Sequence, residues 1–108
     1  MIATTSGDAK APELRGLGAD EVNNYRKGPD WAAEVRKLTA GSGVQLVLEI
    51  GGAGTFSQSL KAVGFGGELA FVGTRAEGGR AMDPNEIFRA RVTVRPLVVG
   101  SRAQFTAM

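Results

Sequence analysis

The stretch QLVLEI at residues 45–50, followed at once by Gly51-Gly52, decides the fold class of this 108-residue chain. A nearly continuous apolar run of this length predicts a strand that is buried on both faces of a parallel sheet. The two glycines end the strand and open the next connection. On both sides of this stretch the same alternation continues, with short apolar runs, glycine-rich joints and amphipathic segments.

Five strands are predicted in total, and amphipathic helical segments lie between them. The predicted strands cover residues 2–5, 21–25, 45–50, 68–72 and 92–99. Helices are predicted from near Pro12 to Leu17, between Asp30 and Gly41, between Thr55 and Gly64, from Pro84 onward, and after Ser101, where SRAQ has the form of a capping box. This alternation predicts a single α/β domain over residues 1–108, built on a parallel sheet.

Composition excludes several classes of function. A formal charge of +2, from 13 basic and 11 acidic residues, gives no basic surface of the kind that binds nucleic acid. No apolar run approaches the roughly 18 residues of a membrane span, and the first residues lack a signal-peptide pattern. We therefore expect a cytoplasmic protein. With no cysteine and no histidine, neither a disulfide nor a thiolate or imidazole metal site can form.

Several blocks together resemble the zinc-type alcohol dehydrogenase and quinone reductase superfamily, the medium-chain dehydrogenases and reductases. They are IATTSGDAK, LGADEVNNYR, DWAAEVRKLTAGSGVQLVLEIGGAGT, QSLKAVGFGGELAFVG and VVGSR. The resemblance covers nearly the whole chain, and LGAD-x-x-x-NY with the spaced GG and FVG strand ends carries most of it. It implies a partial Rossmann domain of about five strands, running from the second strand to the sixth. The first strand, its glycine-rich loop and the catalytic domain are expected to be absent.

A Rossmann sheet without its first strand has lost its central member, because the complete order is 3-2-1-4-5-6. The strands on either side are then expected to have unpaired edges. They can pair directly, which gives the flavodoxin-like order 2-1-3-4-5. Alternatively, a strand from a second copy completes the sheet in a homodimer.

The resemblance also implies which residues bind a dinucleotide. Ser6, Lys10 and Tyr25 match positions that hold the 2′-phosphate in quinone-reductase-like members, and hydroxyl and ammonium donors suit a dianion. NADP is therefore the expected cofactor, with NAD as the alternative. In the alternative reading Ser6 caps a helix, Lys10 is a solvated charge and Tyr25 is a half-buried strand end.

Glycine-rich strand ends form the second group of candidate residues. In the family such positions contact the nicotinamide ribose and carboxamide, where a side chain would block the flat ring. The residues expected to do so here are Gly51, Gly52, Val72, Gly73 and Val99. Alternatively, the glycines only turn the chain into the next loop.

Three further residues carry predictions about structure. Glu49 is a lone carboxylate in an apolar strand and has no paired acid or base, so a structural role is expected. Pro96 predicts an edge strand, because proline cannot donate to a ladder. Asn23 stands where an apolar strand residue is usual in the family. We expect no catalytic and no metal-binding residue in this chain.

The function expected from the resemblance is hydride transfer between NADP(H) and an alcohol, aldehyde, ketone or quinone. The 108 residues supply only part of the cofactor site, so the chain alone is expected to be inactive. Zinc, if it is used at all, belongs to the catalytic domain. A different class of function is a non-catalytic α/β module that binds a nucleotide weakly or acts by association. A flavodoxin-like flavin domain is disfavoured, since no hydroxyl-rich phosphate loop follows the first strand.

Overall fold

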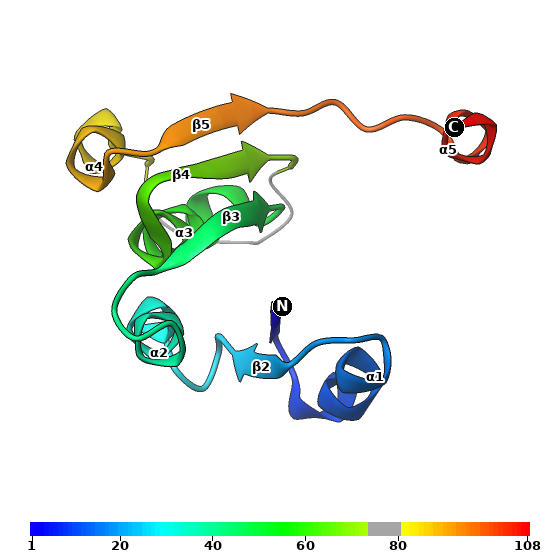
Figure 1. Ribbon diagram of the computed structural model, residues 1–108, viewed down its shortest axis with the longest axis horizontal. Coiled ribbons are helices and arrows are strands. Elements are labelled where there is room, and N and C mark those ends of the chain that lie inside the picture. The colour runs from blue at the N-terminus through cyan, green and yellow to red at the C-terminus, as the bar shows by residue number, and fades with distance from the viewer. Residues whose placement is uncertain (74–80) are drawn as a thin grey trace.

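The computed structural model describes residues 1–73 and 81–108, and these residues show the predicted alternation of strands and helices (Figure 1). The strands are β1 (Ile2–Thr5), β2 (Glu21–Asn24), β3 (Val44–Glu49), β4 (Val63–Phe71) and β5 (Thr93–Pro96). The helices are α1 (Ala11–Gly16), α2 (Trp31–Leu38), α3 (Phe56–Ala62), α4 (Pro84–Ala90) and α5 (Arg102–Ala107), with 3-10 turns η1 (Asp8–Lys10) and η2 (Gly52–Gly54). Within the described part of the chain, no helix is long and apolar enough to span a bilayer.

Every strand pair is parallel, as the buried apolar runs predict, but the strands form two separate ladders. β1 pairs with β2, and β4 pairs with β3 on one side and with β5 on the other. Figure 1 shows the two groups standing apart, with α2 between them. In the doubly wound order 3-2-1-4-5-6 these ladders correspond to the neighbours 3-2 and 4-5-6. The α/β class and the partial Rossmann sheet are therefore confirmed.

Direct pairing of β1 with β3, the flavodoxin-like order, is wrong for this chain. The two strands share no ladder in the described residues. Helix α2 contributes Ala32 and Val35 to a small buried cluster that also includes Ala62 of α3. Ile2 of β1 and Val44 of β3 both pack against this cluster. The two strands thus share a helical contact without a ladder, and they occupy the places of strands 2 and 4 in the order 3-2-1-4-5-6, which are not neighbours.

The larger core lies between α3 and the three-stranded ladder. Phe56, Leu60, Val63 and Leu69 are all at most 4% exposed. Phe56 also meets Phe71 edge to face, with ring centroids 6.0 Å apart. Val47 and Val94, from the strands on either side of β4, pack against the same cluster. This core packs α3 against β3 and β4 and so fixes these two strands, at whose ends Gly51, Gly52, Val72 and Gly73 lie.

Two strand boundaries differ from the prediction by more than one residue. β4 begins at Val63, five residues early, because α3 ends at Ala62 and Val63 is already extended and pairs with Val44. β5 ends at Pro96 rather than at residue 99, although the N–H of Leu97 still donates to the carbonyl of Phe71 at 2.9 Å. In the described residues β5 pairs only with β4, so the edge position predicted from Pro96 is confirmed.

The helix starts agree with the sequence prediction more closely than these strand boundaries do, and α2 is the exception in its capping contact. The Asp83 carboxylate accepts the N–H of Asn85, and Ser101 with Gln104 forms the predicted capping box. Asp30 stands at the cap position of α2 but makes no capping hydrogen bond. The N–H of Ala32 instead donates to the side-chain oxygen of Gln58 in α3, at 2.9 Å. A contact from another helix therefore satisfies a donor that local sequence assigns to the cap.

Candidate functional site

The candidate site is the edge of the sheet at which the parallel strands end. The N–H of Tyr25 donates to the carbonyl of Thr5 at 3.1 Å, so the residue after β2 lies beside the end of β1. Ser6 directly follows Thr5, and Lys10 ends the η1 turn that comes next. Tyr25 and Ser6 are half-buried, whereas Lys10 is exposed. The structure thus places the three predicted phosphate-binding residues on one pair of strand ends, while their role stays a prediction.

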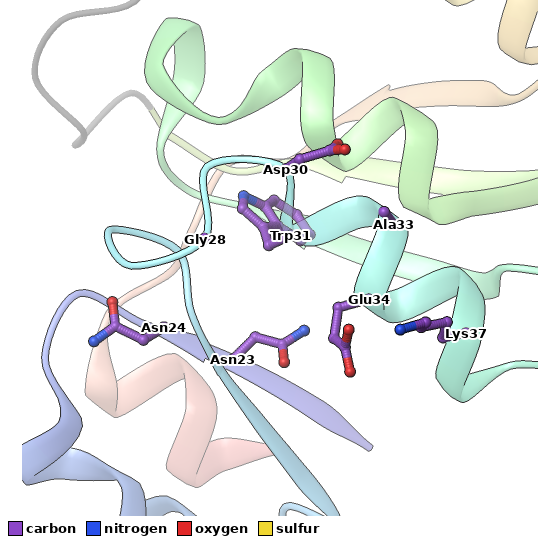
Figure 2. A pocket seen from close by; sticks show the side chains of 8 residues that line it. All are labelled: Asn23, Asn24, Gly28, Asp30, Trp31, Ala33, Glu34 and Lys37. Carbon is purple, nitrogen blue, oxygen red and sulfur yellow. The ribbon is translucent and has the colours of Figure 1, made fainter.

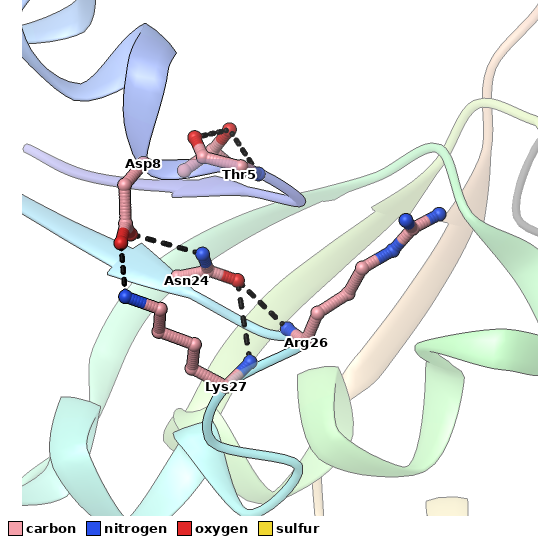
Figure 3. Close-up of polar contacts among 6 residues, drawn as sticks. Thr5, Asp8, Asn24, Arg26 and Lys27 are labelled. Carbon is pink, nitrogen blue, oxygen red and sulfur yellow. Dashed lines mark hydrogen bonds and ion pairs between the residues drawn. The ribbon is translucent and has the colours of Figure 1, made fainter.

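A polar network that the sequence analysis missed connects the same two strand ends (Figure 3). The Asp8 carboxylate accepts the side-chain amide of Asn24 at 2.9 Å and forms an ion pair with Lys27. The carbonyl oxygen of the Asn24 side chain accepts the N–H groups of Arg26 and Lys27. Hydrogen bonds from Asn24, and then from Lys27, hold the pKa of the Asp8 carboxyl below its usual value. The signal in the sequence was an asparagine at the end of a strand, which commonly organises a turn.

At the end of β3 a buried carboxylate holds the following loop. Glu49 is only 2% exposed. One of its oxygens accepts the N–H of Gly51 at 2.7 Å and of Gly52 at 2.9 Å, together with the hydroxyl of Thr55. The other oxygen accepts the hydroxyl of Ser59, which is also buried. Four donors compensate the desolvation of this charge, in agreement with the structural role expected for Glu49.

These hydrogen bonds to Glu49 limit the contacts that Gly51 and Gly52 can make with a ligand. Their N–H groups already bind Glu49 and cannot donate to a cofactor in this arrangement. Glycine is also required locally: a Cβ on Gly51 would lie 2.2 Å from the hydroxyl of Thr55, and Gly52 has a φ of +77°. These contacts explain both glycines as parts of the turn. Their contact with a nicotinamide stays a prediction that concerns only their Cα and carbonyl groups.

Of the other residues predicted to contact the nicotinamide, Val72 and Gly73 follow β4, and Val99 follows β5. The N–H groups of Val72 and Gly73 both point at the carbonyl of Glu49, at 2.8 and 3.4 Å, which brings the ends of β3 and β4 together. Val99 lies on the connection between β5 and α5 and is 74% exposed. Thr74, the next residue in the sequence after Gly73, lies outside the described residues.

A cavity of about 430 Å³ lies between the end of β2 and α2, and Asn24 of the polar network is one of its lining residues (Figure 2). Asn23, Trp31, Glu34 and Lys37 are among its lining residues, and the predicted cofactor-binding residues are not. The side-chain nitrogen of Asn23 is buried and has no hydrogen-bond partner in the described residues. Trp31 is half-buried and packs against the small cluster that contains Ala32 and Val35. The polar departure at Asn23 therefore leaves a buried donor without a partner in the described residues, in a residue that lines the cavity.

These observations define the class of the protein. Its parallel strands in two ladders match part of a doubly wound α/β domain, a fold that binds ligands at the carboxyl ends of its strands. The family model described as zinc-binding dehydrogenase matches residues 1–108. The chain therefore belongs to the zinc-binding dehydrogenase family, and the resemblance read from the sequence is confirmed.

Individual relatives agree with this assignment. A zinc-type alcohol dehydrogenase-like protein of Schizosaccharomyces pombe is 33% identical over 114 residues, which cover 100% of this chain and 32% of that protein. The crystal structure of an NAD-dependent alcohol dehydrogenase matches with a TM-score of 0.81 and 30% identity, over 98% of this chain and 31% of its own. A mycobacterial protein in complex with NADPH matches with a TM-score of 0.76 and 34% identity, over 99% and 33%. The chain thus spans about a third of the length of these relatives.

Proposed function

We propose that this chain forms part of the cofactor-binding domain of an oxidoreductase that transfers hydride between NADP(H) and an alcohol, aldehyde, ketone or quinone. The observation that carries the proposal is the hydrogen bond from Tyr25 N–H to the Thr5 carbonyl, which sets Tyr25 beside Ser6. Lys10 follows in the next turn and has no ion-pair partner in the described residues. Two hydroxyls and an ammonium group suit a ribose 2′-phosphate.

The residues present fit a dinucleotide only in part. The 2′-phosphate has candidate partners, whereas the chain carries no G-x-G-x-x-G turn to hold a pyrophosphate against a helix N-terminus. When bound, the nicotinamide ring supplies or accepts the hydride. In this proposal the chain's own residues bind and orient the adenosine half of the cofactor. We accordingly propose that the 108-residue chain has no dehydrogenase activity by itself.

Zinc does not fit the donors of this chain. It has neither cysteine nor histidine, and in residues 1–73 and 81–108 no three carboxylates gather as a metal-binding group. We therefore assign no step of the proposed function to a metal held by these residues. A catalytic zinc, if the whole protein uses one, has its ligands in other parts of that protein.

Calorimetric titration with NADP, NAD and 2′-phospho-AMP tests the cofactor proposal. We expect the phosphorylated ligands to bind more tightly than NAD, and Lys10→Ala to remove most of that preference, since a charge-assisted hydrogen bond contributes about 1.5–3 kcal/mol. Glu13→Ala, a change in α1 away from the strand ends, is the control and should leave the preference intact. Equal affinity for NADP and NAD would contradict the assignment of NADP.

A second function, association with another copy of the chain, is favoured by one observation. Leu46 and Leu48 of β3, and Ile50 directly after it, are 53%, 67% and 55% exposed, although the sequence of this run predicts a buried strand. In the described residues, β1 and β3 each have one ladder partner, so each leaves one edge open to a further strand. We propose a cytoplasmic homodimer in which a strand of the partner completes the sheet. Light scattering that gives a monomer mass at high micromolar concentration would argue against it.

A further inference from the structure

A second cavity, of about 390 Å³, lies between α3 and α4 at the amino ends of the parallel strands. The buried side chain of Leu60 lines it, together with Phe65 of β4, which is 78% exposed. Figure 1 shows α4 at the end of the three-stranded ladder from which the strand arrows point away. The predicted cofactor-binding residues follow the opposite ends of the strands and do not line this cavity. An occupant of this cavity therefore goes beyond the proposed function.

Phe65 is an exposed aromatic side chain on an ordered part of the backbone. The guanidinium carbon of Arg91 lies 5.8 Å from the centroid of its ring, within reach of a cation–π interaction. The N–H of Gly66 donates to the carbonyl of Arg91 at 3.1 Å. On the other side of Phe65, a Cβ on Gly64 would lie 2.3 Å from the carbonyl oxygen of Ser42, so the two backbones pack closely. A ring that is already held in place loses little entropy when a partner covers it.

The charge around this cavity is positive. Among the described residues that line it, Arg36, Lys61 and Arg89 are cations. None of the three has an ion-pair partner in residues 1–73 and 81–108. Glu86 carries the opposite charge in the lining, and its carboxylate accepts the hydroxyl of Ser57 at 3.0 Å. The cations thus exceed the acid, and their charges are available to an external anion.

One of these cations is fixed in its position. The guanidinium of Arg36 donates to the backbone carbonyls of Lys61, Gly41 and Val63 at 2.9, 2.9 and 2.8 Å. These acceptors are neutral, so the positive charge is not cancelled. A guanidinium has five N–H donors, and donors therefore remain beside those three hydrogen bonds. Arg36 supplies a preorganised cation next to Leu60 and Phe65.

We propose that this cavity is a docking site for an acidic segment of a partner protein. An apolar side chain of the segment covers Leu60 and Phe65, and its carboxylates pair with the surrounding cations. Charge complementarity and the exposed ring both favour this chemistry, since protein interfaces place apolar anchors at the centre and charged groups at the rim. A free phosphate would leave the ring of Phe65 uncovered. The formal charge of +2 for the whole chain gives no extended field of the kind that attracts nucleic acid.

Titration of the 108-residue chain with a synthetic peptide, followed by NMR, tests the proposal. The peptide carries glutamates on both sides of one central phenylalanine. We expect the amide resonances of Leu60, Phe65 and Ala90 to shift with a Kd of about 1 mM or below, and the affinity to fall as salt is added. A peptide with lysines in place of the glutamates should not bind. A short DNA duplex that binds this face more tightly than the acidic peptide would overturn the proposal.

Matched substitutions separate a specific contact from general exposure and charge. Phe65→Ala should weaken binding of the acidic peptide about tenfold. Phe88→Ala removes a ring that is 82% exposed and does not line the cavity, and it should change binding less than about twofold. Lys61→Ala should weaken binding about threefold, and Lys37→Ala, with the same loss of charge on α2, less than about twofold. Unperturbed resonances of the core show that each variant is folded.

Three results would contradict the docking site. Equal losses in Phe65→Ala and Phe88→Ala show only that exposed rings attract the peptide. Equal losses in Lys61→Ala and Lys37→Ala show only the effect of net charge. Absence of shifts at Leu60 and Phe65 with millimolar acidic peptide shows that this face does not bind it. Each result leaves the cofactor proposal in place, because NADP is expected at the other edge of the sheet.

Discussion

Glu49 and Asp8 each hold the chain that follows a parallel strand, and we call their hydrogen-bond networks the buried brace and the exposed brace. Glu49, at the end of β3, is 2% exposed and accepts four hydrogen bonds. Asp8, after β1, has a side chain that is 59% exposed and accepts two partners. A buried charge must have all its partners because no water replaces them, whereas an exposed charge can exchange each partner for water. The first brace is therefore part of the fold, and the second can be altered without loss of the fold.

The largest effect is expected at the buried brace. Glu49→Ala leaves the N–H groups of Gly51 and Gly52 and the hydroxyl of Ser59 without their acceptor, and should cost about 3 kcal/mol or more. Glu49→Gln should cost less, because the hydroxyl of Ser59 can turn to accept from the new amide. Urea unfolding measures the loss, and hydrogen exchange at Gly51 and Gly52 reports the loop directly. A loss below about 1 kcal/mol in Glu49→Ala would show that water enters this end of β3 freely.

A gain in stability is expected at Asn23, which lies near the exposed brace. The buried side-chain nitrogen of this residue has no partner in the described residues and faces the space between β2 and α2. Asn23→Val replaces it with an apolar group suited to a strand and should stabilise the chain by about 1 kcal/mol. Thermal unfolding checks the direction, with Asn23→Ser as a polar control. Destabilisation by valine would mean that the amide has a partner in solution.

The smallest effect concerns the titration of Asp8. Its pKa lies below the ordinary value of 3.8, first because of the Asn24 hydrogen bond and then because of Lys27. A depressed pKa means that the stabilisation is complete above about pH 4 and is lost as the pH falls through the folded value. Asn24→Ala should raise this pKa toward 3.8, and NMR titration of the Asp8 carboxyl measures the shift. Asp20, whose pKa is lowered by the amino terminus at the opposite edge, is an internal control that should not move.

The two braces also differ in how far the sequence could predict them. The sequence predicts a structural role for Glu49, because this lone carboxylate in an apolar strand has no paired acid or base. Its donors Thr55 and Ser59 were not recognised, since the turn of η2 and the start of α3 bring them back to the strand end. The network of Asp8 was missed entirely. Its partners are 16 and 19 residues away, and only the pairing of β1 with β2 brings them within reach.

The sequence by itself determined the α/β class, the family, the parallel direction of the strands and the edge position of Pro96. These follow from local periodicity, proline chemistry and family motifs, which do not depend on distant contacts. The tertiary structure decided that β1 and β3 share no ladder in the described residues; Ile2 and Val44 instead pack against one cluster that includes Ala32 and Val35 of α2. It also decided that Gly51 and Gly52 donate to Glu49, and that Lys27 rather than Arg26 is paired. Both outcomes depend on which groups the fold brings within hydrogen-bond distance, and spacing along the chain does not specify this.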